Sequence, residues 1–381
     1  MSKRILCIYG TRPEVIKMAP VVQALSRRPE FEVRTCDTGQ HREMSGPVIE
    51  WFGLRTDHQL GLMTPSQGLS QFMAQALAKI DEVLAETAPD LLVCQGDTTT
   101  AAAAALAAFH RQIPVAHVEA GLRTGDRHAP WPEEINRRVI DLVADRYYAP
   151  TRSAADALLR EGVPAASILI TGNTAIDALL WTIKKLEANS PAFASGHDRP
   201  FVLITAHRRE SFGAGMQSIA DALVTLAGRF PDTDWIFPVH LNPNVHEVMH
   251  TRLGGLPNVK LLEPLDYPRF CQLLSRCTFV LTDSGGVQEE APALGKPVLV
   301  LREVTERPEG VAGGTVKLVG CSAIRIVEEA TRLLQDPAAL KAMSVPGNFY
   351  GDGTAAEQIA TDLAGVTSNG NGGKRFVVSP A

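Results

Sequence analysis

One segment combines a turn that can bind an anion with acidic side chains placed directly after it. Residues 279–301, FVLTDSGGVQEEAPALGKPVLVL, consist of an apolar strand-like run, a Gly-Gly turn that opens a helix, and a second apolar run. Backbone N–H groups and a hydroxyl from Ser284, Gly285 and Gly286 can approach an anion at a helix N-terminus. The carboxylate of Glu290 can then bind sugar hydroxyls. The segment suits a nucleotide, although an ordinary strand-turn-helix with solvated glutamates explains it equally well when it is taken alone.

Three acidic side chains of the first half stand where strand-like runs end or a helix begins. Asp97 follows the run LLVCQ, Glu119 follows VAHV, and Glu133 begins a helix that also carries Arg137. Each acid alone has an ordinary explanation as an N-cap or a first-turn residue. Three carboxylates on one rim repel each other unless a function or cations require them. Because acids on opposite faces of a carbon can remove and deliver a proton, we favour an acid–base site.

Basic side chains and histidines stand at further strand ends. Arg12 and Lys17, in GTRPEVIK, suit a pyrophosphate as a fixed fork and a flexible ammonium. His207, in AHRRES, can stabilise charge on a departing phosphate. His240 and Arg307 follow two further strand-like runs and add polarity there. The ordinary explanation of each is a cap, a core-edge residue or a solvated loop.

The elements that must position these residues alternate between strand and helix. In the first half we expect strands at residues 4–9, 33–38, 91–95, 115–118, 147–149 and 168–171. Helices are expected between them at residues 13–26, 69–86, 98–109, 133–144, 153–161 and 174–186. In the second half we expect strands at residues 201–205, 234–239, 259–262, 279–282, 298–301 and 316–318. This alternation specifies parallel sheets covered by helices on both faces.

The length of the chain favours two domains. Its 381 residues exceed one ordinary core, and two domains of about 150–200 residues are expected. We predict α/β Rossmann-like domains at residues 1–172 and 173–354, joined near residues 171–189, and a disordered tail at residues 367–381. Ligands of such sheets bind beyond the carboxyl ends of the strands. The two parallel sheets are therefore expected to face each other across a cleft.

Composition excludes several classes of protein. The chain is 45% hydrophobic and 21% charged, as in a globular enzyme, and its net charge of -5 argues against a general nucleic-acid binder. No apolar run is long enough to span a bilayer, so we predict no membrane partner. The N-terminus lacks the pattern of a signal peptide, and the six cysteines look like core residues of a reducing compartment. A cytoplasmic location is therefore expected.

No cofactor is expected from the motifs. The cysteines show neither CxxC nor zinc spacing, which predicts no metal site. No GxGxxG follows any strand-like run, so a bound dinucleotide is not expected. Chemistry through a transient ketone is correspondingly disfavoured.

Several segments together resemble one enzyme family. They are GTRPEVIKMAP, TGQHREM, QGDTTT, HVEAGLRTGD, PWPEEINR, HRRESFG, HLNPNV, DSGGVQEEAPALGKPVLVLRE and TERPEG. Their order and spacing resemble those of bacterial non-hydrolysing UDP-N-acetylglucosamine 2-epimerases, from residue 3 to residue 365. The resemblance implies a GT-B fold, which is two Rossmann-like domains with the site between them. It also implies that a final helix, near residues 355–366, crosses back onto the first domain.

The resemblance further implies a reaction. The family interconverts UDP-GlcNAc and UDP-ManNAc without an added redox cofactor, and so supplies ManNAc precursors for surface polysaccharide. UDP is eliminated with loss of the C2 proton to give an enzyme-held glycal, and it adds back after protonation of the other face. Pyrophosphate cradles, several acids and no nicotinamide site fit this scheme.

The family's motifs imply roles for single residues. Asp97, Glu119 and Glu133 are the acid and base candidates, with no assignment to a face of C2. His207 resembles the family's leaving-group residue, and Arg137 resembles one that orients the site. The residues that match UDP-binding positions are Arg12, Lys17, Ser284, Gly285 and Glu290, the last as the ribose partner. We add Gly286, His240 and Arg307 to the expected substrate-binding set.

Some members of the family bind a second UDP-GlcNAc as an activator. Gln40, His41 and Gln67 match positions used there. Ser66 stands where some members carry an arginine, and Glu43 stands where a glutamine can occur. Activation therefore stays an open hypothesis. The resemblance also implies a homodimer.

Other functions remain as alternatives. A GT-B glycosyltransferase would need an acceptor groove and would leave C2 untouched. A hydrolysing epimerase would release free ManNAc and UDP. A sister epimerase acting on a UDP-diacetamido-uronic acid would need a cation for the extra carboxylate. A non-catalytic sensor of nucleotide sugars is disfavoured because every candidate acid is present.

Overall fold

The chain forms two compact units. The structure is a computed structural model that describes residues 2–40, 42–189, 199–365, 367–368 and 376–377. The first unit comprises Met1–Ala178 together with Gly351–Ala381, and the second comprises Leu179–Tyr350. The predicted tail at 367–381 lies mostly outside the described residues, where only the short strands β14 (Thr367–Ser368) and β15 (Phe376–Val377) are described.

The first unit is built on a parallel sheet, which has seven strands within the described residues. Their order is β3-β2-β1-β4-β5-β6-β7. The strands are β1 (Lys3–Tyr9), β2 (Phe31–Asp37), β3 (His58–Gln59), β4 (Leu91–Gln95), β5 (Val115–Val118), β6 (Arg146–Ala149) and β7 (Ile168–Ile170). The direction of strand order reverses between β1 and β4, which is the switch point where ligands of such sheets bind.

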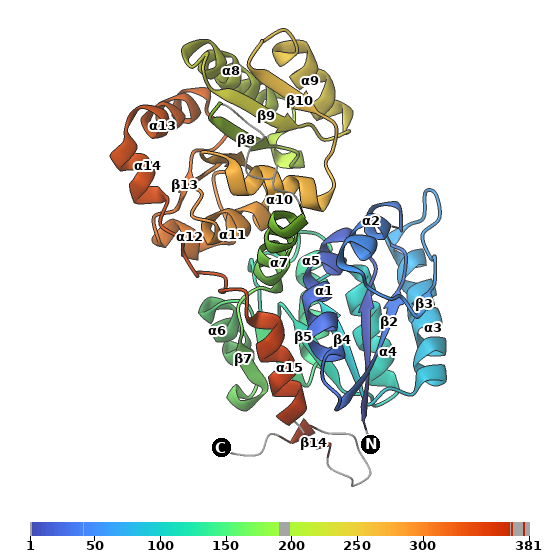
Figure 1. Cartoon of the computed structure of the whole chain (residues 1–381). Helices are drawn as coiled ribbons and strands as arrows, with labels where there is room; N and C mark the ends of the chain where they lie inside the picture. The colour runs from blue at the N-terminus through green and yellow to red at the C-terminus, as the bar shows by residue number, and fades with distance from the viewer. Residues whose placement is uncertain (1, 41, 190–198, 366, 369–375, 378–381) are drawn as a thin grey trace. The chain divides into compact units, whose positions relative to one another are not determined.

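Helices cover this sheet in two groups of neighbours (Figure 1). One group consists of α1 (Arg12–Ser26), α2 (Arg42–Phe52) and α15 (Ala355–Gly365), in which α1 contacts the other two. The other consists of α3 (Leu69–Thr87), α4 (Thr99–His110) and α5 (Glu133–Val143), in which α4 contacts the other two. The unit also contains α6 (Arg152–Arg160) and the short η1 (Ala165–Ser167), while α7 (Thr174–Asn189) begins in this unit and continues into the second.

The composition of β4 and α4 explains their central place. Every residue of β4 is buried, as expected for a parallel strand covered on both faces. Helix α4 has the sequence TTAAAAALAAFH, and all of its alanines are buried. Small side chains allow the helix to approach its neighbours and the sheet closely, and alanine loses no side-chain entropy on burial. Asp97, in the turn between β4 and α4, is thus attached to a rigid part of the unit.

Helix α15 is fastened to the first unit by polar contacts. Asp362 forms an ion pair with Arg146 and accepts a hydrogen bond from Tyr148 at 2.9 Å. Lys3 and Arg28 also donate to this helix. At its start, the backbone N–H of Ala356 donates to Asp177 at 2.8 Å. Helix α15, near the end of the chain, therefore belongs to the same unit as β1 at the beginning of the chain.

The second unit repeats the same strand topology. Its sheet, of six strands within the described residues, is parallel and has the order β10-β9-β8-β11-β12-β13. The strands are β8 (Phe201–Thr205), β9 (Asp234–Pro238), β10 (Val259–Leu262), β11 (Val280–Thr282), β12 (Val298–Val300) and β13 (Val316–Leu318). The helices are η3 (Arg209–Ser211), α8 (Ala214–Arg229), α9 (Pro243–Leu253), α10 (Tyr267–Arg276), α11 (Gly285–Ala293), α12 (Pro308–Ala312), α13 (Ala323–Gln335) and α14 (Pro337–Met343). Its core includes the fully buried Trp235 and Phe237.

The predicted fold class, α/β with two Rossmann-like domains on parallel sheets, is confirmed. Every predicted strand is present, and the largest difference at an end is at β2, which begins at residue 31 instead of 33. Strand β3 was not predicted, because two residues are too few to show a pattern. No helix within the described residues is long and apolar enough to cross a membrane.

Candidate functional site

Most of the predicted site residues of the first unit lie at or beyond the carboxyl edge of its sheet. Strands β1 and β4 are neighbours at the switch point, and β5 lies beside β4. Arg12 begins α1 just after β1, Asp97 follows β4, and Glu119 follows β5 directly. The parallel order thus brings together turns that are far apart in sequence, at the edge where ligands bind.

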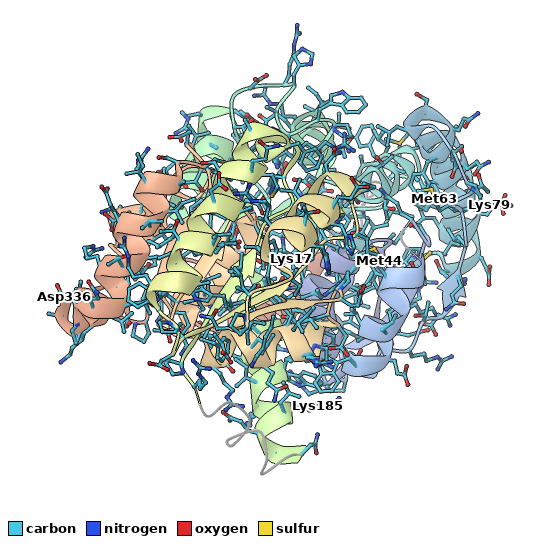
Figure 2. The ribbon with its side chains drawn as sticks, turned by 90° about the horizontal axis from the view of Figure 1, so that it is seen from above. Lys17, Met44, Met63, Lys79, Lys185 and Asp336 are labelled. Atoms are coloured by element: carbon cyan, nitrogen blue, oxygen red, sulfur yellow. The ribbon has the colours of Figure 1, made fainter. Side chains whose placement is uncertain are left out.

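Glu119 is held by an ion pair and two amide groups. The Nζ of Lys17 lies 2.6 Å from Oε1 and 2.7 Å from Oε2 of Glu119. The side-chain amides of Asn173 (2.8 Å) and Gln95 donate to the same carboxylate. The Lys17 side chain is only 20% exposed. By contrast, Lys79 is 52% exposed and projects from the outside of α3 (Figure 2). The acid is held by side chains from three separate segments, which are α1, β4 and the residues just before α7.

The backbone at Glu119 is strained. Its φ is +66°, in the left-handed region that non-glycine residues seldom occupy. Such conformations persist where surrounding contacts over-determine them, and they cluster at functional sites. Glu119 Oε2 also lies 3.5 Å from the position that a Cβ on Gly96 would take, so the carboxylate stands beside the turn that leads to Asp97.

Asp97 pairs with Arg137. The guanidinium of Arg137 donates to Oδ2 of Asp97 at 2.5 and 3.2 Å, and the side chain of Asn136 donates to the Asp97 carbonyl at 3.0 Å. The N-cap of α4 is Thr98, whose hydroxyl accepts from the N–H of Ala101 at 3.0 Å. Helix capping therefore does not account for Asp97, whose side chain is 26% exposed.

Glu133 and its neighbour Glu134 have different surroundings. Glu133 is half-buried in the first turn of α5, and one of its carboxylate oxygens is buried without a hydrogen-bond partner among the described residues. Glu134 is fully buried and pairs with Arg137 at 2.7 Å and Arg138 at 3.1 Å. Burial alone would raise the pKa of Glu134, but the N–H of Thr124 and the two guanidiniums hold it below its usual value. Sequence reasoning missed Glu134, since nothing in PEEINRR distinguishes the two acids.

A buried histidine supports the turn that carries Asp97. His117 lies with Nδ1 2.6 Å from Asp141 and with Nε2 2.7 Å from the carbonyl of Gly96. Asp141 also pairs with Arg123 at 2.8 Å and accepts from the N–H of Gly121. Burial would raise the pKa of Asp141, but His117 and Arg123 hold it below its usual value. His117 and Arg123 both stand in the segment HVEAGLRTGD, but their spacing there does not reveal this supporting role.

In the second unit, His207 is oriented by a buried acid. Strands β8 and β11 are neighbours at the switch point, with His207 after β8 and Asp283 after β11. Asp283 accepts from the N–H groups of His207 (2.6 Å) and Arg208 (2.8 Å), and its Oδ1 lies 3.1 Å from His207 Nδ1. Burial would raise the pKa of Asp283, but His207 and these N–H groups lower it. His240 stacks on His207 with a centroid distance of 5.6 Å, and burial followed by the charge of His207 lowers the pKa of His240.

The N-terminus of α11 carries the predicted anion cradle. Ser284 is its N-cap, and its N–H donates to the hydroxyl of Thr282 at 2.9 Å. A Cβ on Gly285 would lie 2.8 Å from Cζ of Arg307, so glycine is required there for the guanidinium to approach. A Cβ added to the exposed Gly286 would meet no atom within 4 Å. A cation thus lies over the first turn of a helix whose N-terminus already favours anions.

The acids of α11 are buried. Glu289 pairs with Arg307 at 2.8 Å and so holds the guanidinium over the turn. Glu290, the predicted ribose partner, is 9% exposed. The pairing of Glu289 was not predicted, because the sequence offers adjacent glutamates without a sign of which faces Arg307.

The predicted activator residues have separate partners. Gln40 accepts from the backbone N–H and the hydroxyl of Thr100 at 3.3 and 2.8 Å. Gln67 accepts from the N–H of Thr64 and donates to Gln75. His41 lies outside the described residues. The activator site stays a prediction.

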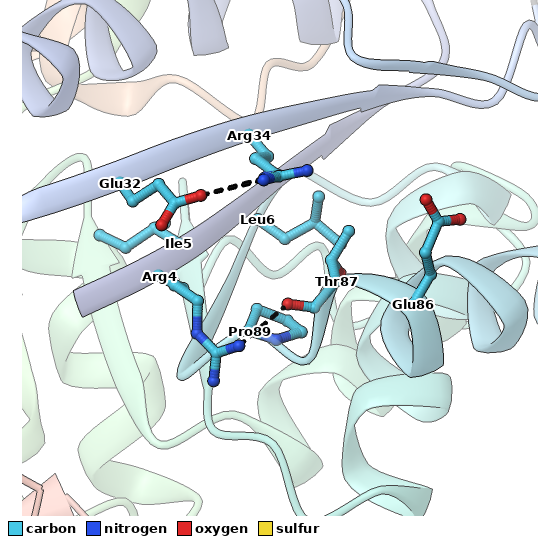
Figure 3. Close-up of a pocket in the computed structure, with 8 residues that line it drawn as sticks. All are labelled: Arg4, Ile5, Leu6, Glu32, Arg34, Glu86, Thr87 and Pro89. Carbon is cyan, nitrogen blue, oxygen red and sulfur yellow. Dashed lines mark hydrogen bonds and ion pairs between the residues drawn. The ribbon is translucent and has the colours of Figure 1, made fainter. Parts of the chain in front are cut away.

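One cavity lies away from all these residues. It measures about 310 Å³ and is bounded by the first residues of β1 and β2 and by the end of α3. On its β2 side, Glu32 pairs with Arg34 (Figure 3). It therefore opens near the amino ends of these strands, opposite the edge that carries the candidate acids. Within the described residues, no group of three or more His, Cys, Asp or Glu side chains could hold a metal ion.

Comparison with known proteins identifies the family. A family model described as UDP-N-acetylglucosamine 2-epimerase matches residues 23–364. The UDP-N-acetylglucosamine 2-epimerase of Escherichia coli strain K12 is 49% identical over 370 residues, which cover 94% of this chain and 98% of that protein. This chain belongs to the UDP-N-acetylglucosamine 2-epimerase family.

Solved structures agree with this assignment. The crystal structure of UDP-GlcNAc 2-epimerase from Neisseria meningitidis bound to UDP-GlcNAc has a TM-score of 0.89 and 43% identity, covering 95% of this chain and 99% of that one. An S. aureus protein in a co-structure with UDP has a TM-score of 0.86 and 43% identity, covering 95% and 96%. The resemblance found in the sequence and the predicted GT-B fold class are confirmed. The family is one of isomerases, so the chain is an enzyme of that class.

Proposed function

We propose that this chain catalyses the reversible epimerisation of UDP-N-acetylglucosamine to UDP-N-acetylmannosamine at C2. The substrate is supported by the family, by the name of the E. coli relative and by the N. meningitidis neighbour solved with UDP-GlcNAc. The chemistry is supported by one observation above all. Two carboxylates, Asp97 and Glu119, stand at adjacent strand ends of one sheet, each with its own cation.

The proposed reaction is an elimination followed by an addition. A carboxylate takes the C2 proton, the C–H electron pair forms the C1=C2 double bond, and the C1–O bond breaks to release UDP. A proton then returns to the opposite face of C2, and the diphosphate oxygen adds back to C1. Two acids on separate turns suit this scheme, because one can accept a proton while another donates one.

Three acids are candidates for these proton transfers, and the proposal assigns none of them to a face of C2. Asp97 and Glu119 are fixed by Arg137 and Lys17. Glu133 has a buried oxygen without a partner among the described residues. Leaving such an oxygen unpaired costs about 1–3 kcal/mol, which a hydrogen bond from a bound sugar hydroxyl would offset. Glu133 is therefore retained as a third candidate.

The second unit is proposed to bind the nucleotide and stabilise the departing diphosphate. His207, oriented by Asp283, can donate to a phosphate oxygen from its second ring nitrogen. Arg307 and the N-terminus of α11 can bind the diphosphate, and Glu290 can bind the ribose. Arg12, at the start of α1 in the first unit, is retained in the predicted substrate-binding set.

The proposal also extends to partners and location. A homodimer is expected from the resemblance, and helix α5 offers an apolar face on which Ile135 is 43% and Leu142 is 84% exposed. These residues are seven apart and lie on one side of the helix. A cytoplasmic location is supported by the six cysteines, which are all free thiols. Supply of ManNAc precursors for surface polysaccharide is proposed from the family resemblance alone.

Incubation with UDP-GlcNAc in D₂O, followed by NMR and mass spectrometry, tests the proposal. We expect UDP-ManNAc with deuterium at C2. Free ManNAc with UDP would instead indicate the hydrolysing branch. No exchange and no product would refute the UDP-GlcNAc assignment and favour a uronic-acid substrate or a transferase. Asp97→Asn should yield neither epimer nor free sugar. Its matched control is Asp81→Asn on α3, which also removes an acid paired with an arginine, Arg111 at the C-terminal end of α4.

A further inference from the structure

A buried glutamate joins two of the turns at the carboxyl edge of the first sheet. Glu14, in the first turn of α1, is only 1% exposed. Its Oε2 accepts from the N–H groups of Gly10 at 3.1 Å and Thr11 at 2.8 Å, in the turn after β1. Its Oε1 accepts from the hydroxyl of Thr98 at 2.6 Å, in the turn after β4. The carboxyl group therefore bridges the two strands at the switch point.

Helix capping explains only half of this arrangement. Thr11 and Glu14 form a capping box, in which the glutamate reaches back to the N–H of Thr11. That motif uses Oε2, and it serves equally well with glutamine, which is neutral. The contact of Oε1 with Thr98, which is 84 residues away, is not part of any cap of α1. An ionisable side chain at a fully buried position thus calls for a second reason.

Thr98 connects Glu14 to the candidate acid. Its hydroxyl donates to Glu14 and accepts from the N–H of Ala101 as the N-cap of α4. Asp97 is the residue directly before it, and its carboxylate faces Arg137. A change in the hydrogen bond between Glu14 and Thr98 therefore acts on the backbone one residue from Asp97.

We propose that Glu14 is a positioning residue, whose carboxylate holds the turn that carries Asp97 in place against the turn that begins α1. The inference rests on the proposed function, in which Asp97 is one of the candidates for proton transfer. When Glu14 is ionised, both of its oxygens accept and Thr98 donates. When Oε1 carries a proton, it must donate to Thr98, and the Thr98 hydroxyl must turn its own proton elsewhere. The protonation state of Glu14 thus changes the bond that fixes the turn.

The surroundings make this change accessible near neutral pH. Burial raises the pKa of Glu14 to about 7, although the hydrogen bonds from Thr98, Thr11 and Gly10 oppose the rise. Cys94 on β4 faces it as well, and burial followed by the charge of Glu14 raises the pKa of that thiol. The charged groups on the neighbouring elements are Arg12 and Lys17 on α1, Asp97 after β4, and Glu119 after β5.

Glu14→Gln tests the proposal, because it imitates the neutral form. Its amide oxygen can keep the bonds to Gly10 and Thr11, while its NH₂ group meets the Thr98 hydroxyl. We expect kcat to fall by about a hundredfold, the effect of a misplacement of about 1 Å, with UDP affinity unchanged. The pH profile of kcat should lose a titration near pH 7. A purely structural residue would leave kcat and its pH profile as they are.

Paired variants of Thr98 and a stability measurement keep the proposal falsifiable. Thr98→Ser retains the hydroxyl and should retain activity, whereas Thr98→Val removes it and should lose kcat. Wild-type kcat and pH profile in Glu14→Gln would overturn the proposal, as would equal activity in the two Thr98 variants. If the wild type produced no epimer in D₂O, the proposed function would fail instead. A stability measurement gives an independent test. The difference in melting temperature between wild type and Glu14→Gln should change between pH 6 and pH 8, and a constant difference would by itself refute the buried charge on Glu14.

Discussion

Removal of the Lys17 ammonium is the sharpest test of how the first unit holds its acids. Lys17→Met keeps an apolar side chain of similar length but removes the ammonium from the carboxylate of Glu119, whose side chain is 6% exposed. The amide donors of Gln95 and Asn173 stay in place. Removing one partner of a buried ion pair typically costs 3–5 kcal/mol. Two amide donors remain and Lys17 is 20% exposed, so we expect the lower end, about 3 kcal/mol.

A double-mutant cycle with Glu119→Gln separates the ion pair from packing. Glutamine has no charge to leave unpaired, so Lys17→Met should cost much less in the Glu119→Gln background. The coupling energy should lie at about 2 kcal/mol, within the range of directly contacting residues. Because the chain has two compact units, the readout is hydrogen exchange of peptides from β1, β4 and β5, which reports on the first unit by itself. A loss of stability below about 1 kcal/mol in Lys17→Met would refute the reasoning. A double variant whose loss of stability equals or exceeds the sum of the two single losses would refute it as well.

Three further predictions follow from the other contacts. Asp97→Asn should abolish turnover while UDP affinity stays within a few-fold, as calorimetry would measure; loss of UDP binding would contradict the division of roles between the units. Asp283→Asn should lower kcat more than it raises KM, because it removes the acid facing His207 Nδ1; unchanged kinetics would contradict that orienting role. Glu14 has a folded-state pKa of about 7 against an ordinary 4.5, so its contribution to stability is fully present below pH 4.5 and is lost as pH rises to 7. The difference of 2.5 pKa units corresponds to about 3 kcal/mol, and Glu14→Gln should lack this dependence in urea titrations at pH 5 and 8.

The strand ends could be predicted from the sequence because the physical signal is local. Runs such as LLVCQ and VAHV are apolar throughout, and in a parallel sheet such runs are buried strands. The polar residue that follows each run must then lie at the carboxyl edge. Asp97 and Glu119 were placed correctly at that edge by this reasoning alone, without any knowledge of their partners.

The partners of these residues could not be predicted, because they depend on contacts between distant segments. Lys17 meets Glu119 across 102 positions, and Glu14 meets Thr98 across 84. Local reasoning also offered a cap for Asp97, although the next residue, Thr98, takes that role. Sequence patterns report which face of an element is buried, but the pairing of side chains across elements follows only once the strand order is known.

The structure also sets the predicted role of Lys17 against its observed contact with Glu119. The resemblance makes Lys17 a ligand of the UDP pyrophosphate, whereas its ammonium contacts both oxygens of Glu119. The two roles give different kinetics in Lys17→Met. If Lys17 binds the pyrophosphate, UDP affinity falls together with kcat, as a lost charge-assisted bond requires. If it serves Glu119 alone, kcat falls while UDP affinity is retained, because the cation then acts only through the acid that it holds. Measuring both quantities for this one variant distinguishes a ligand of the substrate from a residue that positions one of the candidate acids.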